Sequence, residues 1–142
     1  MLCYSSLFFM TNAITSFWVN NYRYSFLFSM LTMTSLMHHT YYTIYTWLID
    51  QVFVVSITAY GGNLFYQKYV PCKQTKFIET ALMMCLFLFY YGYCTNQYCF
   101  HPDKNIGDQY HFLLHFIGSL GHHGIIACTN VPKCNPNLLP AK

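Results

Sequence analysis

Charged side chains are scarce in this sequence. Asp, Glu, Lys and Arg make up 8% of its 142 residues, whereas an average soluble domain contains about 25%. Hydrophobic residues account for 55% of the chain and aromatic residues for 20%. A soluble protein of this size needs charged side chains to keep its surface hydrated, so the composition argues against a soluble domain and favours a membrane protein.

Three further absences narrow the choice of function. The formal net charge is +3 and the basic residues are scattered, so the chain lacks the basic patch of a nucleic-acid-binding protein. None of its seven cysteines belongs to a Cys-x-x-Cys motif, which argues against a cysteine-ligated zinc site. The sequence has no internal repeat, low-complexity tract or linker. It therefore predicts one helical domain over residues 1–130, followed by a tail over 131–142.

The few charges divide the chain into long uncharged runs, with turn signals at Asn20-Asn21, Pro71 and Pro102. A helix that crosses a hydrocarbon core of about 30 Å needs about 20 residues, and most of the runs are long enough. The sequence therefore predicts an all-α, polytopic transmembrane bundle of about five helices. We expect them near residues 3–20, 23–39, 46–66, 77–95 and 108–128.

The first of these helices is the most polar, because Thr11, Asn12, Thr15 and Ser16 interrupt it. An uncleaved signal-like segment is the alternative interpretation. The segment lacks the basic start of a signal peptide, so a membrane helix is preferred.

Basic residues lie mostly on one of the two sides that five crossings define. Six of the seven fall in or beside the 20–22 turn, the 67–76 loop and the tail, whereas Lys104 alone falls on the other side. The positive-inside rule then predicts a cytosolic C-terminus. The N-terminus and the 96–107 loop would face the lumen or the exterior. Cys94 and Cys99 lie on that oxidising side and could form a disulfide.

Polar residues inside the apolar runs are spaced by one helical turn. Ser35 and His39 share one helix face, and His111 and His115 share another. Asp50 begins the third helix. Because the helices alternate in direction, all five residues should lie at a similar depth on the lumenal side. Ionisable groups inside membrane helices are costly and usually functional.

Three neutral imidazoles suit a catalytic zinc site, which takes three protein ligands and leaves a position for water. His39, His111 and His115 are the predicted ligands of Zn²⁺. The metal would lower the pKa of its bound water. Asp50 and Ser35 are the predicted catalytic residues, because a carboxylate can hold the water, orient a ligand ring or accept a proton during hydrolysis.

Other readings of the histidines remain open. Each could be an interfacial residue at a helix end, or the residues could hold a bis-histidine haem, although ligands one turn apart on the same face fit haem poorly. His122 lies close to the face of His111 and could contact a substrate, but an interhelical hydrogen bond is the favoured reading. Gly118, Gly121 and Gly124 form a small-residue stripe that is typical of helix packing.

The pattern resembles the CREST superfamily of membrane hydrolases, which includes the alkaline ceramidases, the progestin and adipoQ receptors and the post-GPI-attachment lipases. The similarity rests on SLMHH…WLID, with Ser35, His39 and Asp50, and on YHFLLHFIGSLG, with His111 and His115. It covers roughly residues 25–66 and 105–128. The register of the motif selects His39 rather than His38.

This resemblance implies a three-histidine zinc site, with Ser and Asp holding the zinc-bound water. It also implies hydrolysis of an amide or ester bond in a membrane lipid, as in a ceramidase. The family has seven helices and this chain about five, so a homodimer could close the lipid cavity. The alternative is a non-catalytic membrane protein that keeps a structural or receptor-type zinc site. The sequence assigns no role to His38 or His123.

Overall fold

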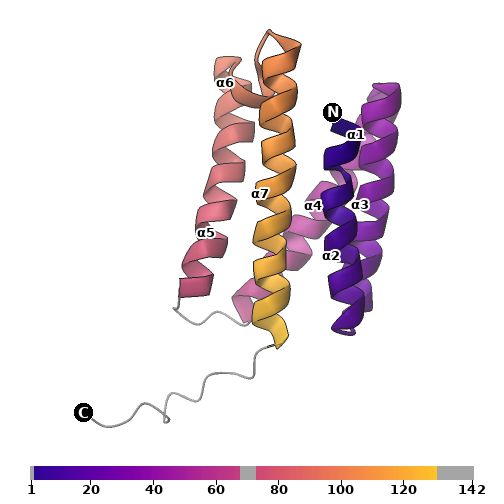
Figure 1. The fold of residues 1–142 in the computed structure, drawn as a ribbon, viewed down its shortest axis with the longest axis vertical. Helices are drawn as coiled ribbons and strands as arrows, with labels where there is room; N and C mark the ends of the chain where they lie inside the picture. Colours follow the sequence, from indigo (N-terminus) through magenta and orange to yellow (C-terminus); the bar gives the residue numbers. More distant parts are fainter. Residues whose placement is uncertain (1, 68–72, 131–142) are drawn as a thin grey trace, which may run out of the picture.

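The computed structural model of the chain describes residues 2–67 and 73–130, and its regular structure there is entirely helical (Figure 1). The predicted tail over 131–142 and the turn at Pro71 lie outside the described residues. The elements in chain order are α1 (Leu2–Ser5), α2 (Leu7–Trp18), α3 (Tyr22–Tyr41), α4 (Ile44–Gln67), α5 (Lys73–Leu86), the π-helical turn η1 (Phe87–Tyr91), α6 (Gly92–Thr95), the 3-10 turn η2 (Tyr98–Phe100) and α7 (Lys104–Asn130). The predicted all-α class is confirmed.

Each predicted helix is present, although the first is divided into α1 and α2 at Ser6 and the fourth consists of α5, η1 and α6. Asn20 adopts a positive φ of 60°, and the side chain of Asn21 then caps α3 by accepting the backbone N–H of Tyr24 at 3.2 Å. Asn tolerates the left-handed conformation and is a strong N-cap residue. These two residues therefore form the turn that the sequence predicts.

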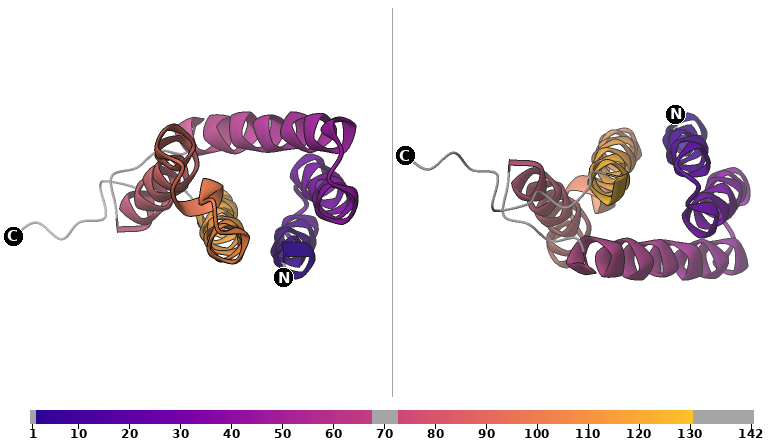
Figure 2. Two further views of the ribbon diagram at one scale, coloured as in Figure 1. Left: turned by 90° about the horizontal axis from the view of Figure 1, so that it is seen from above. Right: turned by 90° about the horizontal axis from the view of Figure 1, so that it is seen from below.

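The helices alternate in direction, so that the N-terminus and two connections meet at one end of the bundle. The N-terminus, the α3–α4 turn and the turn between α6 and α7 lie together at the top of Figure 1. The other helices form two pairs, α2 with α3 and α5 with α7. Helix α4 spans obliquely from the first pair to the second along one side of the bundle (Figure 2). This arrangement places the end of α3 near the beginning of α7.

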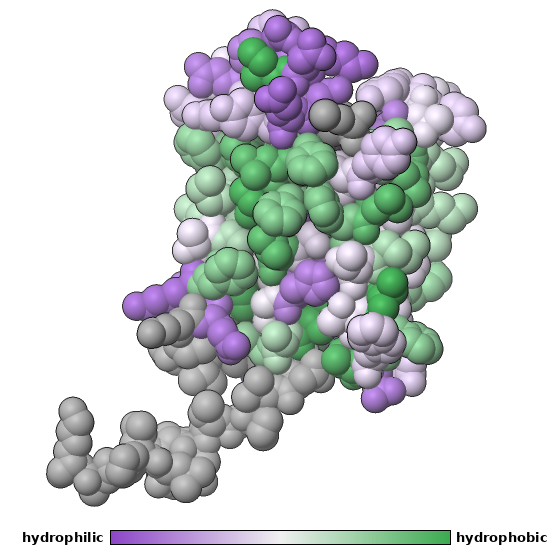
Figure 3. All heavy atoms as spheres, in the orientation of Figure 1, coloured by the Kyte–Doolittle hydropathy of each residue, from purple (hydrophilic) through white to green (hydrophobic). Residues whose placement is uncertain are grey.

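The face of the bundle that Figure 3 shows is largely apolar between two more polar ends. Within the described residues, three helical segments are long and apolar enough to cross a membrane: Ile44–Gln67, Gln74–Phe100 and Lys104–Thr129. On α4, for example, Val52 and Val55 are 61% and 64% exposed. Large exposed apolar surfaces mark contacts with a membrane or a partner. Membrane crossing by α2, which has 12 residues, and by the more polar α3 remains a prediction.

The predicted disulfide is absent from the structure, because Cys94 and Cys99 are both free. Cys94 is exposed on α6, whereas Cys99 is half-buried in η2, which packs beside α7. The two thiols thus belong to different elements, α6 and η2, although only five positions separate them in the sequence.

Small residues on α7 allow α5 to pack closely against it. A Cβ atom added to Gly118 would lie 3.8 Å from Cys85 Sγ, one added to Gly121 would lie 3.2 Å from Ala81 Cβ, and one added to Gly124 would lie 2.8 Å from Ile78 Cγ1. The glycine stripe is therefore a packing face, as its spacing predicts.

The space available for a side chain decreases from Gly118 to Gly124, and substitution of these glycines by Ala should show the difference as a change in stability. We expect Gly124→Ala to lower the free energy of unfolding by about 1–3 kcal/mol through overpacking. Gly118→Ala should be neutral or stabilising, because Ala favours helix by about 1 kcal/mol relative to Gly. Detergent-to-SDS titration followed by circular dichroism measures both. Gly124→Ala should cost less in an Ile78→Ala background than in the wild type, because the shortened side chain leaves room for the added methyl group, and equal effects at both glycines would contradict the expectation.

Candidate metal centre

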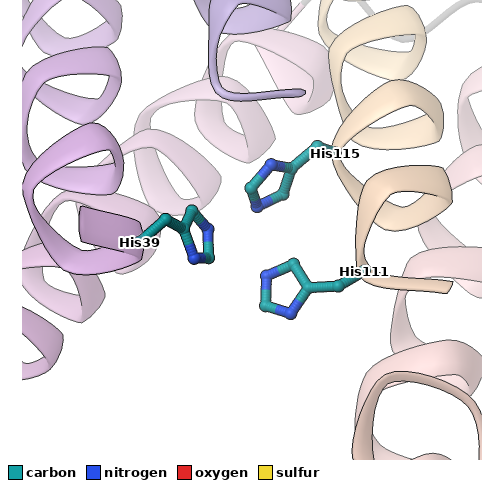
Figure 4. Close-up of side chains that lie close together, drawn as sticks. All are labelled: His39, His111 and His115. Carbon is teal, nitrogen blue, oxygen red and sulfur yellow. The ribbon is translucent and has the colours of Figure 1, made fainter. Parts of the chain in front are cut away.

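Three histidine side chains meet at the end of the bundle where α3 finishes and α7 begins (Figure 4). His39 comes from α3, and His111 and His115 come from α7. One ligand atom from each residue lies within 4.8 Å of the corresponding atoms of the other two. The ring centroids are 5.1 Å apart for His39–His111, 5.4 Å for His39–His115 and 4.8 Å for His111–His115. The predicted histidine cluster is confirmed.

Helix geometry explains why these three residues converge. His111 and His115 are one turn apart on α7, so their rings extend from the same face. His39 lies in the last turn of α3. His39 and His115 are buried, with 5% and 8% of their surface exposed, whereas His111 is half-buried. The centre is therefore mostly shielded from the surface.

The nitrogen atoms of the cluster fit a metal ion. His39 Nδ1 is buried and has no hydrogen-bond partner among the described residues, which is costly for a polar atom unless it gains another ligand. Nitrogens that share one tetrahedral zinc at about 2.0 Å would be about 3.3 Å apart. Small side-chain rotations from the observed separations would give that geometry. The donor set, three uncharged imidazoles, suits Zn²⁺ among other transition metals.

The two predicted catalytic residues lie in separate hydrogen-bonded pairs. Ser35 Oγ is 2.9 Å from Ser6 Oγ, and Thr34 Oγ1 donates to Asp50 Oδ1 at 3.2 Å. Ser35 and Asp50 are both buried. Among the described residues, neither is hydrogen-bonded to an imidazole of the cluster. Their roles toward a metal-bound water thus remain predictions.

Two residues that were not predicted from the sequence lie beside this centre. Ser5 Oγ lies 2.8 Å from His115 Nδ1, and both groups are buried. Asp108 lies one turn before His111 on α7 and is half-buried. The three-residue spacing of Asp108 and His111 was a usable sequence signal. The contact between Ser5 and His115 joins residues 110 positions apart, and no sequence signal predicts it.

The remaining interior histidines are engaged elsewhere or lie beside the cluster. His122 Nδ1 is hydrogen-bonded to the Tyr24 hydroxyl between α7 and α3, which is the interhelical role favoured from the sequence. His123 Nε2 is 2.9 Å from Thr11 Oγ1 of α2. The ring of His38 is 5.2 Å from that of His39. Contact between His122 and a substrate is therefore not needed to explain that residue.

No family model, curated protein sequence or solved structure matches this chain. The residues that form the centre, and the fold that positions them, therefore provide the basis for assigning a function.

Proposed function

We propose that this chain is a zinc-dependent membrane hydrolase that cleaves an amide or ester bond of a membrane lipid. The observation that supports the proposal is the convergence of His39, His111 and His115, with ligand atoms within 4.8 Å of one another. The centre lies at one end of an apolar helical bundle, where a lipid headgroup and water can meet. The proposal includes a cytosolic C-terminus and a centre on the lumenal or exterior side, from the distribution of basic residues.

Three histidines would hold the metal and leave one position open, as in other catalytic zinc sites. A bound Zn²⁺ supplies a Lewis acid that polarises a carbonyl group and lowers the pKa of bound water. The shielding of His39 and His115 would exclude bulk water and strengthen electrostatic interactions at the centre. Asp50 and Ser35 would assist as proton acceptor and hydrogen-bonding group after rearrangement away from Thr34 and Ser6.

A non-catalytic zinc site is the second candidate, and one observation favours it. The carboxylate of Asp50 accepts a hydrogen bond from Thr34, and the hydroxyl of Ser35 is paired with Ser6. Groups that are already satisfied in this way contribute to packing rather than to proton transfer. Under this alternative, zinc would join α3 to α7 and stabilise the bundle without turnover.

Turnover on lipids distinguishes the two candidates. Purified protein in lipid nanodiscs should release fatty acid from a panel of ceramides and ester-linked lipids, detected by mass spectrometry. We expect removal of the metal with a chelator to abolish release, and one equivalent of Zn²⁺ to restore it. Asp50→Asn should reduce turnover by about 10²–10⁴-fold if Asp50 transfers a proton, while zinc content stays unchanged. Stoichiometric zinc without turnover on any lipid of the panel would favour the non-catalytic site.

A further inference from the structure

Helix α1 and the adjoining Ser6 bring polar side chains to the metal centre from a third part of the chain. Ser5 Oγ is 2.8 Å from His115 Nδ1 of α7, and Ser6 Oγ is 2.9 Å from Ser35 Oγ of α3. Cys3 Sγ donates to the backbone carbonyl of His39 at 3.6 Å. The short N-terminal helix thus contacts both halves of the histidine cluster.

The contact between Ser5 and His115 determines which nitrogen is free to bind a metal. A neutral imidazole carries its single proton on either Nδ1 or Nε2, and the unprotonated nitrogen is the ligand. His115 Nδ1 faces the Ser5 hydroxyl and is therefore not available to a metal. If Nδ1–H donates to Ser5 Oγ, Nε2 keeps its lone pair. In the opposite arrangement the serine donates, Nε2 is protonated and the ring cannot bind.

We propose that Ser5 is a positioning residue of the metal centre, which holds His115 in the tautomer with Nδ1–H and directs Nε2 at the metal. The inference rests on the zinc-binding part of the proposed function. It adds to that proposal an explanation of how one ligand, His115, is oriented. Metal-ligating histidines almost always donate their second N–H to a fixed acceptor, and loss of that acceptor weakens metal affinity. Both residues are buried, so water does not readily replace the hydroxyl.

A consequence is that the metal centre is assembled from three segments rather than two. His115 of α7 depends on α1 for its orientation, whereas His39 belongs to α3. The N-terminal segment, whose polar residues made it the most ambiguous helix in the sequence, would then be required for tight metal binding.

Zinc affinity in a Ser5→Ala variant tests the inference. We expect the dissociation constant, measured by competition with a chromogenic chelator, to increase about 10–100-fold. Ser5→Thr retains a hydroxyl and should recover most of the affinity. Ser119→Ala is the matched control. Ser119 is also a buried serine that joins α7 to the N-terminal part of the chain, where it accepts from Asn12 Nδ2 at 2.6 Å, but among the described residues it is not hydrogen-bonded to a cluster imidazole. Its affinity should change less than about threefold. A Ser5→Ala affinity within that range would overturn the inference.

Nitrogen NMR of ¹⁵N-histidine-labelled protein without metal provides a second measurement that does not require zinc. The wild-type His115 ring, assigned by comparison with His115→Ala, should carry its proton on Nδ1, and Ser5→Ala should show a mixture of tautomers. A wild-type proton on Nε2 would overturn the inference. If wild type binds no zinc, the proposed function fails and the NMR result alone decides the role of Ser5. Normal zinc binding by Ser5→Ala would instead reject only the role of Ser5.

Discussion

Replacing His39 or His115 by Ala is expected to reduce bound zinc from about one ion per chain to less than about 0.1. Each substitution leaves two imidazoles, which do not complete a stable site with Zn²⁺. The two residues come from different helices, α3 and α7, so loss at both positions would show that the metal bridges them. Inductively coupled plasma mass spectrometry of detergent-purified protein measures the ratio directly.

His123→Ala is the matched control for these variants. It removes an imidazole from the same helix as His115, but its ring contacts Thr11 rather than the cluster. It should retain about one zinc per chain. Circular dichroism should show equal helix content in all the variants, which separates loss of metal from loss of fold. Wild-type zinc content in both His39→Ala and His115→Ala would contradict a shared site, and so would equal losses in the His123→Ala control.

The number of helices and the way their ends are grouped were predictable, because the chain has so few charged residues. Uncharged runs determine how many helices there are, and their number determines which ends lie together. Four-residue spacing then places His111 and His115 on one face of α7, and alternation of direction brings His39 to the same end. These steps use only helix geometry and chain direction, and so the histidine cluster was predictable without knowledge of lateral packing.

The surroundings of the cluster depend on how each helix is rotated and tilted, which spacing does not determine. Asp50 lies in the part of α4 that follows the α3–α4 turn, but the oblique path of α4 and the hydrogen bond from Thr34 decide its partner. Ser5 acquires its role because α1 lies beside α7, a contact between the two ends of the described chain. No local sequence pattern predicts the contact of Asp50 with Thr34 or that of Ser5 with His115.

Gly61→Leu is expected to destabilise the bundle by about 2–4 kcal/mol, because it adds a side chain where α4 packs closely against residues of α3 and α7. A Cβ atom at Gly61 would lie 2.5 Å from Tyr24 Oη, 3.1 Å from His122 Cε1 and 3.2 Å from His122 Nδ1. Tyr24 is fully buried, and its hydroxyl is hydrogen-bonded to His122. A larger side chain must therefore separate this pair or displace α4, leaving buried polar groups without partners.

Gly62→Leu is the control for that substitution, since a Cβ atom at Gly62 meets nothing within 4 Å. Both variants gain about the same helix propensity, on the order of 0.7 kcal/mol, so their difference isolates the packing of α3, α4 and α7. SDS titration in mixed micelles should give a lower unfolding midpoint for Gly61→Leu than for Gly62→Leu. Because α4 joins the α2–α3 pair to the α5–α7 pair, the same variant should also weaken zinc binding, as it moves His39 relative to His111 and His115. Equal midpoints for the two variants would show that α4 does not pack against Tyr24 and His122 in this way.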